Sequence, residues 1–302
     1  MERRISIVDV FTDKPLTGNQ LGVVHECEGL DDEAMQRIAR EFNFAETIFL
    51  SPPDNDAHSA RVRIFTPKNE LPFAGHPTVG AAILVAMEQG LDAAGHGLLV
   101  LEENVGPVRC AVRFDGGAAY AEFDLPVIAE RMVPDGEKEA AAAALGLAVT
   151  DIGFENHVHS AFHAGLPYQL VPVRDLATVA RAQPQMQFWR DGFGTDSHNS
   201  AYVYCRETVG HDNHFHARMF APDAGIPEDP ATGSAVASFA GAVALFDDLP
   251  DGQHTIRVEQ GIEMGRPSLI TLEIEMADGA MTGGRIGGNA VIFARGVIDV
   301  GL

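Results

Sequence analysis

The sequence FAGHPTVGAA, residues 73–82, decides how the first half of the chain folds. It places His76 between Gly75 and Pro77, directly before a continuous apolar run from residue 79 to residue 87. A helix that is apolar on nearly all sides is a buried helix. The stretch therefore predicts a loop that leads into a buried helix at residues 77–89.

A second copy of this arrangement occurs later in the chain. RIFTP at residues 63–67 precedes the first copy, and RMFAP at residues 218–222 precedes PEDPATGSA at residues 227–235. Aligned from His76 and from Asp229, the two copies share their proline, their glycine and their last alanine. A second apolar helix is predicted at residues 235–246. The repeat predicts two similar halves, in which His76 and Asp229 are equivalent positions.

Both helix starts are candidate anion sites. Pro77 and Pro230 suit the first helical position, where a missing N–H has no cost. The other N–H groups there have no acceptor in the helix, so two facing starts could hold a small carboxylate between them. Four small residues would allow close approach to the backbone: Gly75, Gly80, Gly233 and Ala235. The alternative is that both are ordinary helix-entry turns, with Asp229 as a simple cap.

Composition limits the classes of partner. The chain has 302 residues, 46% of them hydrophobic, which is enough for a full core and two domains. A formal net charge of -22 argues against nucleic acid and anionic membranes, although a local field from helix starts still permits a small anionic substrate. Three unpatterned cysteines predict no disulfide framework or zinc site. The N-terminus shows no cleavage signal and no run of membrane-spanning length occurs, so we expect a soluble cytoplasmic protein.

The rest of the pattern predicts mainly strands around each buried helix. Strand-like segments occur at residues 5–11, 21–25, 44–50, 61–65, 98–102, 108–114 and 118–123, and again at 201–205, 214–220, 255–259 and 269–276. Each half is predicted to be a curved sheet wrapped around one central helix. The halves should meet near Leu125 and Pro126. A long irregular middle should follow, with helical segments at 137–145 and at 176–189, the latter interrupted by Pro184.

Two further segments carry polar residues near strands. Glu46 lies inside the strand-like run at residues 44–50, where it is either an exposed strand end or a carboxylate held in a pocket for proton transfer. EQGIEMGRPS, residues 259–268, places Gly, Arg and Pro between two strands and predicts a loop at the rim of the second sheet.

Four motifs occur in one order: AETIFL around Glu46, FAGHPTVGAA around His76, PEDPATGSA around Asp229, and EQGIEMGRPS. In this combination the chain resembles the PhzF-like phenazine-biosynthesis isomerases over nearly its whole length. The resemblance implies an α+β, diaminopimelate-epimerase-like fold: two similar domains, each a barrel-like sheet around a central α-helix, with the active site in the cleft between them. It also places the final strand in the first domain, so the expected domains are 1–125 with 285–302, and 126–284.

The resemblance further implies a homodimeric isomerase without a cofactor, acting on a small cyclic amino acid or related carboxylate of the trans-2,3-dihydro-3-hydroxyanthranilate type. Glu46 would relay the proton, supported by His76 and Asp229. The substrate-binding residues would be Gly75, Ser234, Gly233, Thr232 and Asn19. Gln20 departs from the pattern, because many relatives carry Pro after Gly-Asn. This difference concerns the rim that selects the substrate.

Three alternatives compete with this interpretation. A cysteine-dependent epimerase or racemase needs two facing thiols, but none of Cys27, Cys110 and Cys205 lies in a special loop. A metal enzyme could use local histidine clusters: His157, His159 and His163, or His211, His214 and His216. Their spacing is not diagnostic, and exposed loop histidines are the commoner outcome. A non-catalytic metabolite-binding protein is the third alternative, which the presence of Glu46 disfavours.

Overall fold

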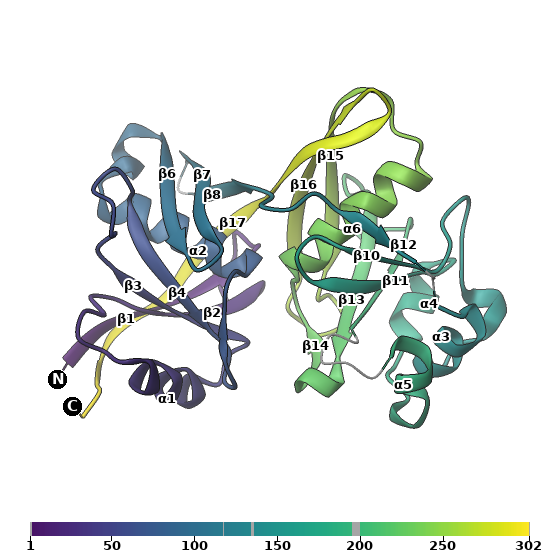
Figure 1. Cartoon of the computed structure of the whole chain (residues 1–302), viewed down its shortest axis with the longest axis horizontal. Helices are drawn as coiled ribbons and strands as arrows, with labels where there is room; N and C mark the ends of the chain where they lie inside the picture. The colour runs from purple at the N-terminus through teal and green to yellow at the C-terminus, as the bar shows by residue number, and fades with distance from the viewer. Residues whose placement is uncertain (1, 117, 134–135, 195–199, 302) are drawn as a thin grey trace. The chain divides into compact units, whose positions relative to one another are not determined.

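The computed structural model describes residues 2–116, 118–133, 136–194 and 200–301. The chain divides into two compact units. Unit 1 comprises Met1–Asp124 with Gly287–Leu302, and unit 2 comprises Leu125–Ile286. In each unit a helix lies among strands, α2 in unit 1 and α6 in unit 2 (Figure 1).

The main strands of unit 1 form a closed ring. In chain order they are β1 (Glu2–Val10), β2 (Asn19–Val24), β3 (Glu46–Ser51), β4 (Ala60–Phe65), β6 (His96–Glu103), β7 (Gly106–Asp115), β8 (Ala118–Asp124) and the end of β17 (Ala280–Asp299), with short β5 (Glu70–Leu71) beside β4. The pairs β2–β3 and β4–β6 are parallel. The pairs β1–β2, β3–β4, β6–β7 and β7–β8 are antiparallel. β17 closes the ring by pairing with both β1 and β8.

The helix α2 (Gly75–Glu88) fills this ring. Every residue from Gly75 to Ala86 is buried, and the helix packs against β1, β2, β3, β4, β6, β7 and β8. The amphipathic α1 (Asp32–Phe42) lies outside, where its Met35 and Ala39 pack on Phe49 and Phe65. A short 3-10 turn, η1 (Leu91–Ala94), follows α2. The apolar composition of α2 thus explains why strands enclose it, and the one-sided pattern of α1 explains its outer position.

Unit 2 repeats the plan with a second curved sheet. Its strands are β9 (Glu130–Met132), β10 (Ser160–His163), β11 (Pro167–Pro172), β12 (Ala201–Cys205), β13 (Phe215–Ala221), β15 (Gly252–Gln260) and β16 (Ser268–Ala277), with β14 (Ile226–Asp229) beside β13. Neighbours in this order pair antiparallel, except the parallel pairs β11–β12 and β13–β15. The helix α6 (Gly233–Phe246) packs against β9, β10, β11 and β16.

Three helices form an outer layer of unit 2: α3 (Lys138–Leu145), α4 (Leu176–Arg181) and α5 (Met186–Phe193). With the 3-10 turn η2 (Val149–Asp151), they build a second core around fully buried Trp189 against β11 and β12. A third 3-10 turn, η3 (Pro222–Ala224), precedes β14. The middle of the chain is therefore less irregular than the sequence suggested. The sequence did not predict β10 and β11. In β11 the prolines at 167 and 172 resemble loop signals, whereas both lie at strand ends, where proline is tolerated.

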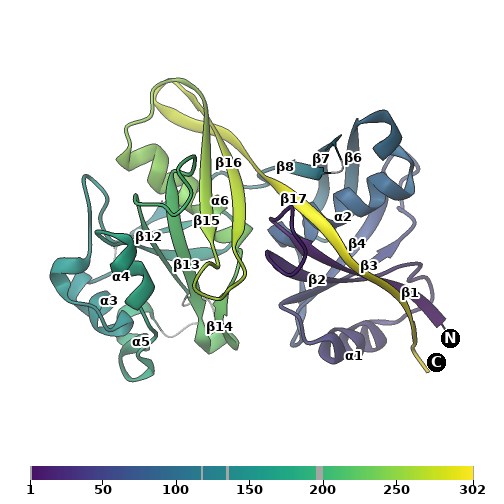
Figure 2. The ribbon, with the colours of Figure 1, turned by 180° about the vertical axis from the view of Figure 1, so that it is seen from behind.

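The long strand β17 links the two units (Figure 2). Its first part belongs to unit 2, where Arg285 Nη2 lies 2.6 Å from Glu273 Oε2 of β16. Its second part begins at Gly287, where any side chain would collide with the hydroxyl of Tyr120. The expected first domain included Leu125, Arg285 and Ile286, and the structure assigns these three residues to unit 2.

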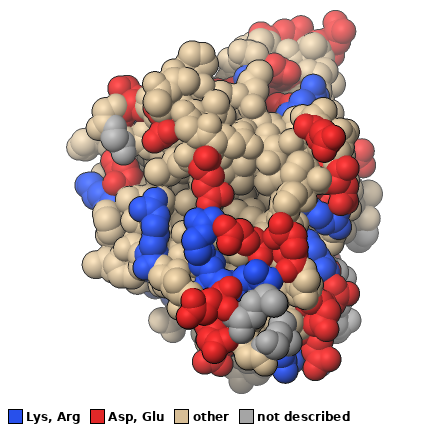
Figure 3. All heavy atoms as spheres, turned by 90° about the vertical axis from the view of Figure 1, so that its left-hand side faces the viewer, with Lys and Arg blue, Asp and Glu red and all other residues tan. Residues whose placement is uncertain are grey.

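Acidic side chains do not form one continuous patch on the face shown in Figure 3. Basic and acidic side chains lie next to one another there. Ion pairs of this kind occur within unit 1, where Arg63 contacts both Asp32 and Glu70 at 2.7 Å. Among the described residues, no helix is long and apolar enough to span a membrane.

Candidate active site

Unit 1 gathers three of the predicted site residues at one end of its sheet. Asn19 is the first residue of β2, Glu46 is the first residue of β3, and His76 is the second residue of α2. β2 and β3 run parallel, with Leu21 opposite Glu46. The first residues of the two strands therefore lie at the same end of the sheet. His76 Nε2 lies 3.7 Å from Glu46 Oε2, and His76 Nδ1 lies 3.4 Å from Asn19 Nδ2. We call these residues the unit 1 cluster.

His76 is a neutral, buried imidazole. Its exposed fraction is 4%, and burial lowers its pKa to about 3, against a smaller raising effect from a hydrogen bond with the backbone of Gln20. Its Nε2 atom is buried and has no hydrogen-bond partner among the described residues. Most buried polar atoms in proteins are hydrogen-bonded, and an exception calls for an explanation. A substrate that supplies the missing partner is such an explanation.

Glu46 is the accessible member of the unit 1 cluster. Its side chain is 15% exposed, compared with 5% for the side chain of His76. Glu46 is thus a largely buried carboxylate at a strand end, and its role in proton transfer stays a prediction. The distance of 3.7 Å to His76 exceeds hydrogen-bond length, so a bound molecule can interact with both side chains.

Unit 2 gathers a second set of predicted residues around the start of α6. Asp229 is the last residue of β14 and is 6% exposed, and its Oδ2 accepts a hydrogen bond of 2.5 Å from Thr232 Oγ1. The amide of Gln260, at the end of β15, donates to the Asp229 carbonyl at 2.7 Å and to Thr232 Oγ1 at 3.0 Å. Gln260 Oε1 accepts from Thr232 N at 3.3 Å. We call Asp229, Thr232 and Gln260 the unit 2 cluster.

The first residues of α6 provide backbone donors next to this cluster. Thr232 is the N-cap, and Gly233 and Ser234 are the first two helical residues, whose N–H groups have no acceptor within a helix. Ser234 Oγ lies 2.7 Å from the hydroxyl of Tyr168 on β11. The N-terminal end of a helix with free N–H groups is suited to bind an anionic group.

The helix starts differ from the sequence prediction. Pro77 is the third residue of α2 and not the first, since α2 begins at Gly75, and Pro230 lies outside α6, three residues before Gly233. Several N–H groups in the first turn of a helix have no acceptor within the helix. Proline, which lacks an N–H, is therefore tolerated beyond the first helical position. His76 is therefore a helical residue, whereas Asp229 ends a strand. Asp229 is also not the cap of α6, because Thr232 holds that position.

Two contributors to these clusters escaped the sequence interpretation. Gln260 was visible only as part of EQGIEMGRPS, the loop motif, which the structure confirms as the connection between β15 and β16. A glutamine where the strand-like segment meets the loop motif was the available signal. Tyr168 gave no signal, because its contact with Ser234 joins residues 66 positions apart.

The histidines form no metal site among the described residues, where no group of three or more metal-binding side chains occurs. Several are not exposed, contrary to expectation: His157, His159 and His216 are at most 5% exposed. His157 bonds to Tyr204 and Asp247, each at 2.9 Å. His216 bonds to Glu259 at 2.8 Å and to Glu263 at 2.9 Å. Carboxylates from distant parts of the sequence thus stabilise buried imidazoles.

The cysteines are unsuited to acid-base catalysis. All three are free and buried. Burial raises the pKa of Cys27 and of Cys205 to about 12, and it also raises the pKa of Cys110. None forms the reactive thiolate that a cysteine-dependent epimerase requires.

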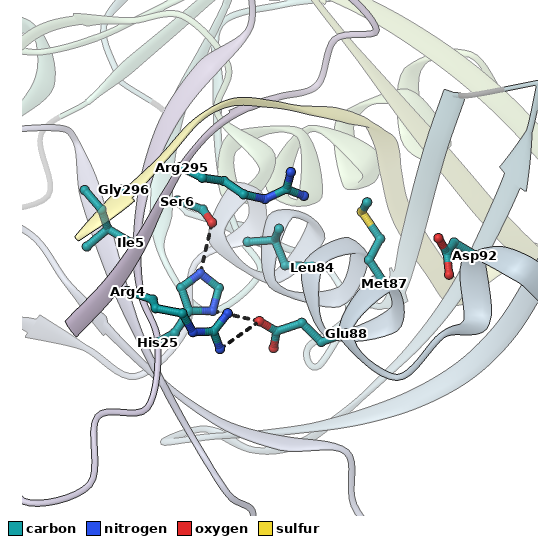
Figure 4. Close-up of a pocket in the computed structure, with 10 residues that line it drawn as sticks. All are labelled: Arg4, Ile5, Ser6, His25, Leu84, Met87, Glu88, Asp92, Arg295 and Gly296. Carbon is teal, nitrogen blue, oxygen red and sulfur yellow. Dashed lines mark hydrogen bonds and ion pairs between the residues drawn. The ribbon is translucent and has the colours of Figure 1, made fainter. Parts of the chain in front are cut away.

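A cavity of about 310 Å³ in unit 1 lies near the C-terminal end of α2, lined by Leu84, Met87 and Glu88 (Figure 4). His76 is at the opposite end of the same helix. The polar groups of the cavity mostly contact one another: His25 contacts Ser6 and Glu88, each at 3.0 Å, and Glu88 also contacts Arg4 at 3.6 Å. This cavity is therefore separate from the unit 1 cluster.

Comparisons with known proteins agree with this fold. Residues 8–296 match the model of the PhzC-PhzF family, described as phenazine biosynthesis-like proteins. An uncharacterized isomerase of Mesorhizobium japonicum is 51% identical over 301 residues, covering 99% of both chains. Trans-2,3-dihydro-3-hydroxyanthranilate isomerase of Pseudomonas aeruginosa is 35% identical over 294 residues, covering 97% of this chain and 98% of the relative. The crystal structure of a PhzF family protein of Bacillus anthracis is 27% identical with a TM-score of 0.86, covering 99% of both chains.

These findings define the protein as an isomerase with an α+β, diaminopimelate-epimerase-like fold. Since the family model covers nearly the whole chain, the chain belongs to the phenazine biosynthesis-like family, PhzC-PhzF.

Proposed function

We propose that this isomerase moves a proton between carbons of a small cyclic amino acid of the trans-2,3-dihydro-3-hydroxyanthranilate type, using side chains without a cofactor. The Pseudomonas aeruginosa relative named for this reaction supports the substrate class. The single observation that carries the proposal is the buried Nε2 of His76, which makes no hydrogen bond among the described residues and lies 3.7 Å from the carboxylate of Glu46.

Glu46 is the proposed base. Its carboxylate takes a proton from one carbon of the substrate. The resulting carboxylic acid, which is 15% exposed and exchanges its proton with solvent, returns a proton to another carbon, so that a double bond moves and no electron is gained or lost overall. One group that both accepts and returns the proton is sufficient for such an isomerisation. Neutral His76 hydrogen-bonds the substrate and stabilises the charge that develops as the proton leaves.

The unit 2 residues are proposed to bind substrate. The backbone N–H groups of Gly233 and Ser234 are suited to a carboxylate, because a helix N-terminus favours negative charge. Asp229 is suited to an amino or hydroxyl group, since its carboxylate accepts hydrogen bonds and Thr232 and Gln260 hold the residue in place. Gly75 and Asn19 are proposed to contact substrate beside His76.

The test is to incubate the protein in D2O with trans-2,3-dihydro-3-hydroxyanthranilate and follow the carbon-bound protons by NMR. The proposal predicts isomerisation with deuterium appearing at the carbon that receives the proton. Exchange into another cyclic amino acid alone would correct the substrate and keep the reaction class. Binding of the compound without isomerisation or exchange would indicate a metabolite-binding protein and contradict the proposal. We also propose a homodimer, which light scattering in solution tests.

A further inference from the structure

Glu103 is a buried carboxyl group to which neither the resemblance nor the proposed reaction gives a role. It is the last residue of β6, and its exposed fraction is 6%. Its Oε1 lies 2.7 Å from Oγ1 of Thr78, in the first turn of α2. The same Thr78 Oγ1 lies 2.8 Å from the carbonyl oxygen of Ala74, the N-cap of α2.

The number of protons in this chain of contacts indicates the charge of Glu103. A threonine hydroxyl has one proton to donate, and a backbone carbonyl can only accept. If Thr78 donates to Ala74, its contact with Glu103 is a hydrogen bond only when Glu103 is protonated and donates to Thr78. A neutral Glu103 therefore satisfies both short contacts, whereas an ionised Glu103 leaves one without a proton.

The surroundings of Glu103 also disfavour a negative charge. Its Oε2 is buried and has no hydrogen-bond partner in the part of the chain that the structure describes. An unpaired buried carboxylate is far more costly than a neutral acid with one unbonded carbonyl oxygen. Burial raises the pKa of Glu103 to about 8, against a smaller lowering by the bond with Thr78.

The groups that face Glu103 supply no counter-charge. From α2 it meets the hydroxyl of Thr78, which does not titrate. From β7 it meets the thiol of Cys110, which burial keeps uncharged by raising its pKa. Within the described residues, no cation forms an ion pair with Glu103 or contributes to its pKa.

We propose that Glu103 is held as a neutral carboxylic acid and is a positioning residue, which donates to Thr78 so that Thr78 donates to Ala74 and fixes the first turn of α2. His76 belongs to this turn, so the catalytic consequence rests on the proposed function, whereas the protonation of Glu103 does not. When Glu103 ionises, the Thr78 proton turns to the carboxylate and the Ala74 carbonyl loses its side-chain donor.

The stability of the protein should report this proton. The pKa of Glu103 is about 8 in the folded protein, against a reference value of 4.5. Between pH 4.5 and pH 8 the folded state therefore binds a proton that the unfolded state does not. The contribution of Glu103 to stability is fully present below pH 4.5 and is lost as the pH rises to 8. Glu103→Gln stays neutral and can donate its amide N–H to Thr78, so it should lack this loss.

The first experiment is infrared spectroscopy of the whole protein from pH 5 to pH 10. The wild type should show the C=O stretch of a buried carboxylic acid that disappears with a midpoint near pH 8, and Glu103→Gln should lack this band. Thermal melting of both proteins should show that the difference in Tm between Glu103→Gln and wild type widens from pH 5 to pH 8. Glu41→Gln, an exposed carboxylate of α1, is the matched control and should behave as wild type. A wild type without the band at pH 6 would overturn the proposal.

The second experiment measures solvent-deuterium exchange into substrate against pH. Wild-type exchange should fall about tenfold per pH unit above pH 8, as expected when only the protonated form is competent. Glu103→Gln should keep its activity over the same range, and Thr78→Val, of the same shape, should be impaired at every pH. An equal alkaline loss in wild type and Glu103→Gln would overturn the positioning role. If no protein exchanges at any pH while the infrared band is present, the proposed function fails and the neutral Glu103 stands.

Discussion

His76 in unit 1 and His216 in unit 2 are both buried imidazoles, with exposed fractions of 4% and 1%. Their protonation differs in opposite directions. The pKa of His76 is lowered to about 3 and that of His216 is raised to about 9. The carboxylate of Glu46 lies 3.7 Å from His76, beyond hydrogen-bond length, whereas His216 lies between Glu259 and Glu263 at 2.8 and 2.9 Å.

The difference teaches that burial alone does not determine the state of a histidine. Desolvation disfavours the imidazolium in both cases, and only hydrogen-bonded carboxylates reverse its effect. His216 is thus a charged link between the end of β15 and the loop that follows it. His76 remains neutral, and its Nε2 makes no hydrogen bond within the described part of the chain. We infer that His216 serves stability and that His76 serves the substrate.

The largest expected effect is on stability, in His216→Asn. This variant leaves Glu259 and Glu263 without their cation, and breaking a buried ion pair costs about 3–5 kcal/mol of the free energy of unfolding. Chemical denaturation at pH 6 measures the loss. His211→Asn, an exposed loop histidine, is the control and should change stability by less than about 0.5 kcal/mol.

The pH dependence of this loss gives an independent check. The pKa of His216 is about 9 when folded and 6.5 as the reference, so its stabilisation is fully present below pH 6.5 and disappears as the pH rises through 9. That decline amounts to roughly 3 kcal/mol. Equal stability differences between wild type and His216→Asn at pH 6 and pH 9.5 would contradict a charged His216.

The same substitution in unit 1 should act on activity instead. His76→Asn keeps a polar atom near the position of Nδ1 and removes Nε2, so exchange into substrate should fall about 10²–10³-fold, as for the loss of one transition-state donor. The free energy of unfolding should fall by less than about 2 kcal/mol, since Nε2 makes no hydrogen bond to any described residue. If denaturation instead shows a loss as large as that of His216→Asn, the contrast between the two histidines is wrong.

A smaller effect is expected from Gln260→Ala in unit 2. The variant removes the donor to the Asp229 carbonyl and leaves buried polar groups unsatisfied, which costs about 1–3 kcal/mol. Activity assays should show a raised KM because Asp229 and Thr232 lose their fixed positions. Gln253→Ala, on the exposed part of the same strand, should leave both quantities unchanged. Unaltered KM in folded Gln260→Ala would remove Gln260 from the site.

Much of the fold could be predicted from the sequence, because the responsible signals are local. The apolar composition of residues 79–87 and 235–246 indicated the two enclosed helices, and the structure confirms both. Strand-like runs indicated most strands, among them the wholly apolar β12 at its observed bounds, Ala201–Cys205. The repeated Pro and Gly skeleton indicated two similar halves but not the register of the helices within it.

The remaining features depend on contacts between distant residues, which one sequence does not show. Whether His157 is buried depends on Tyr204 and Asp247, 47 and 90 positions away. The protonation of Glu103 depends on Thr78, 25 positions away. In the candidate site, the residue types were readable from the motifs. The surroundings of His76 Nε2 and the hydrogen bonds of Gln260 depend on contacts between distant segments, which the motifs do not show. The roles of Glu46, His76 and Asp229 stay predictions.

The most direct test of the central claim compares the two carboxylates, Glu46 of unit 1 and Asp229 of unit 2. Solvent-deuterium exchange into substrate is measured at rising substrate concentration for wild type, Glu46→Gln and Asp229→Asn, each first shown to be folded by its melting curve. Glu46→Gln should lose exchange even at saturation, because an amide cannot act as the base. Asp229→Asn should approach the wild-type rate at saturation with a raised KM, as expected for a binding residue. Exchange at the wild-type rate by Glu46→Gln, with its loss in Asp229→Asn, would show that Glu46 is not the base.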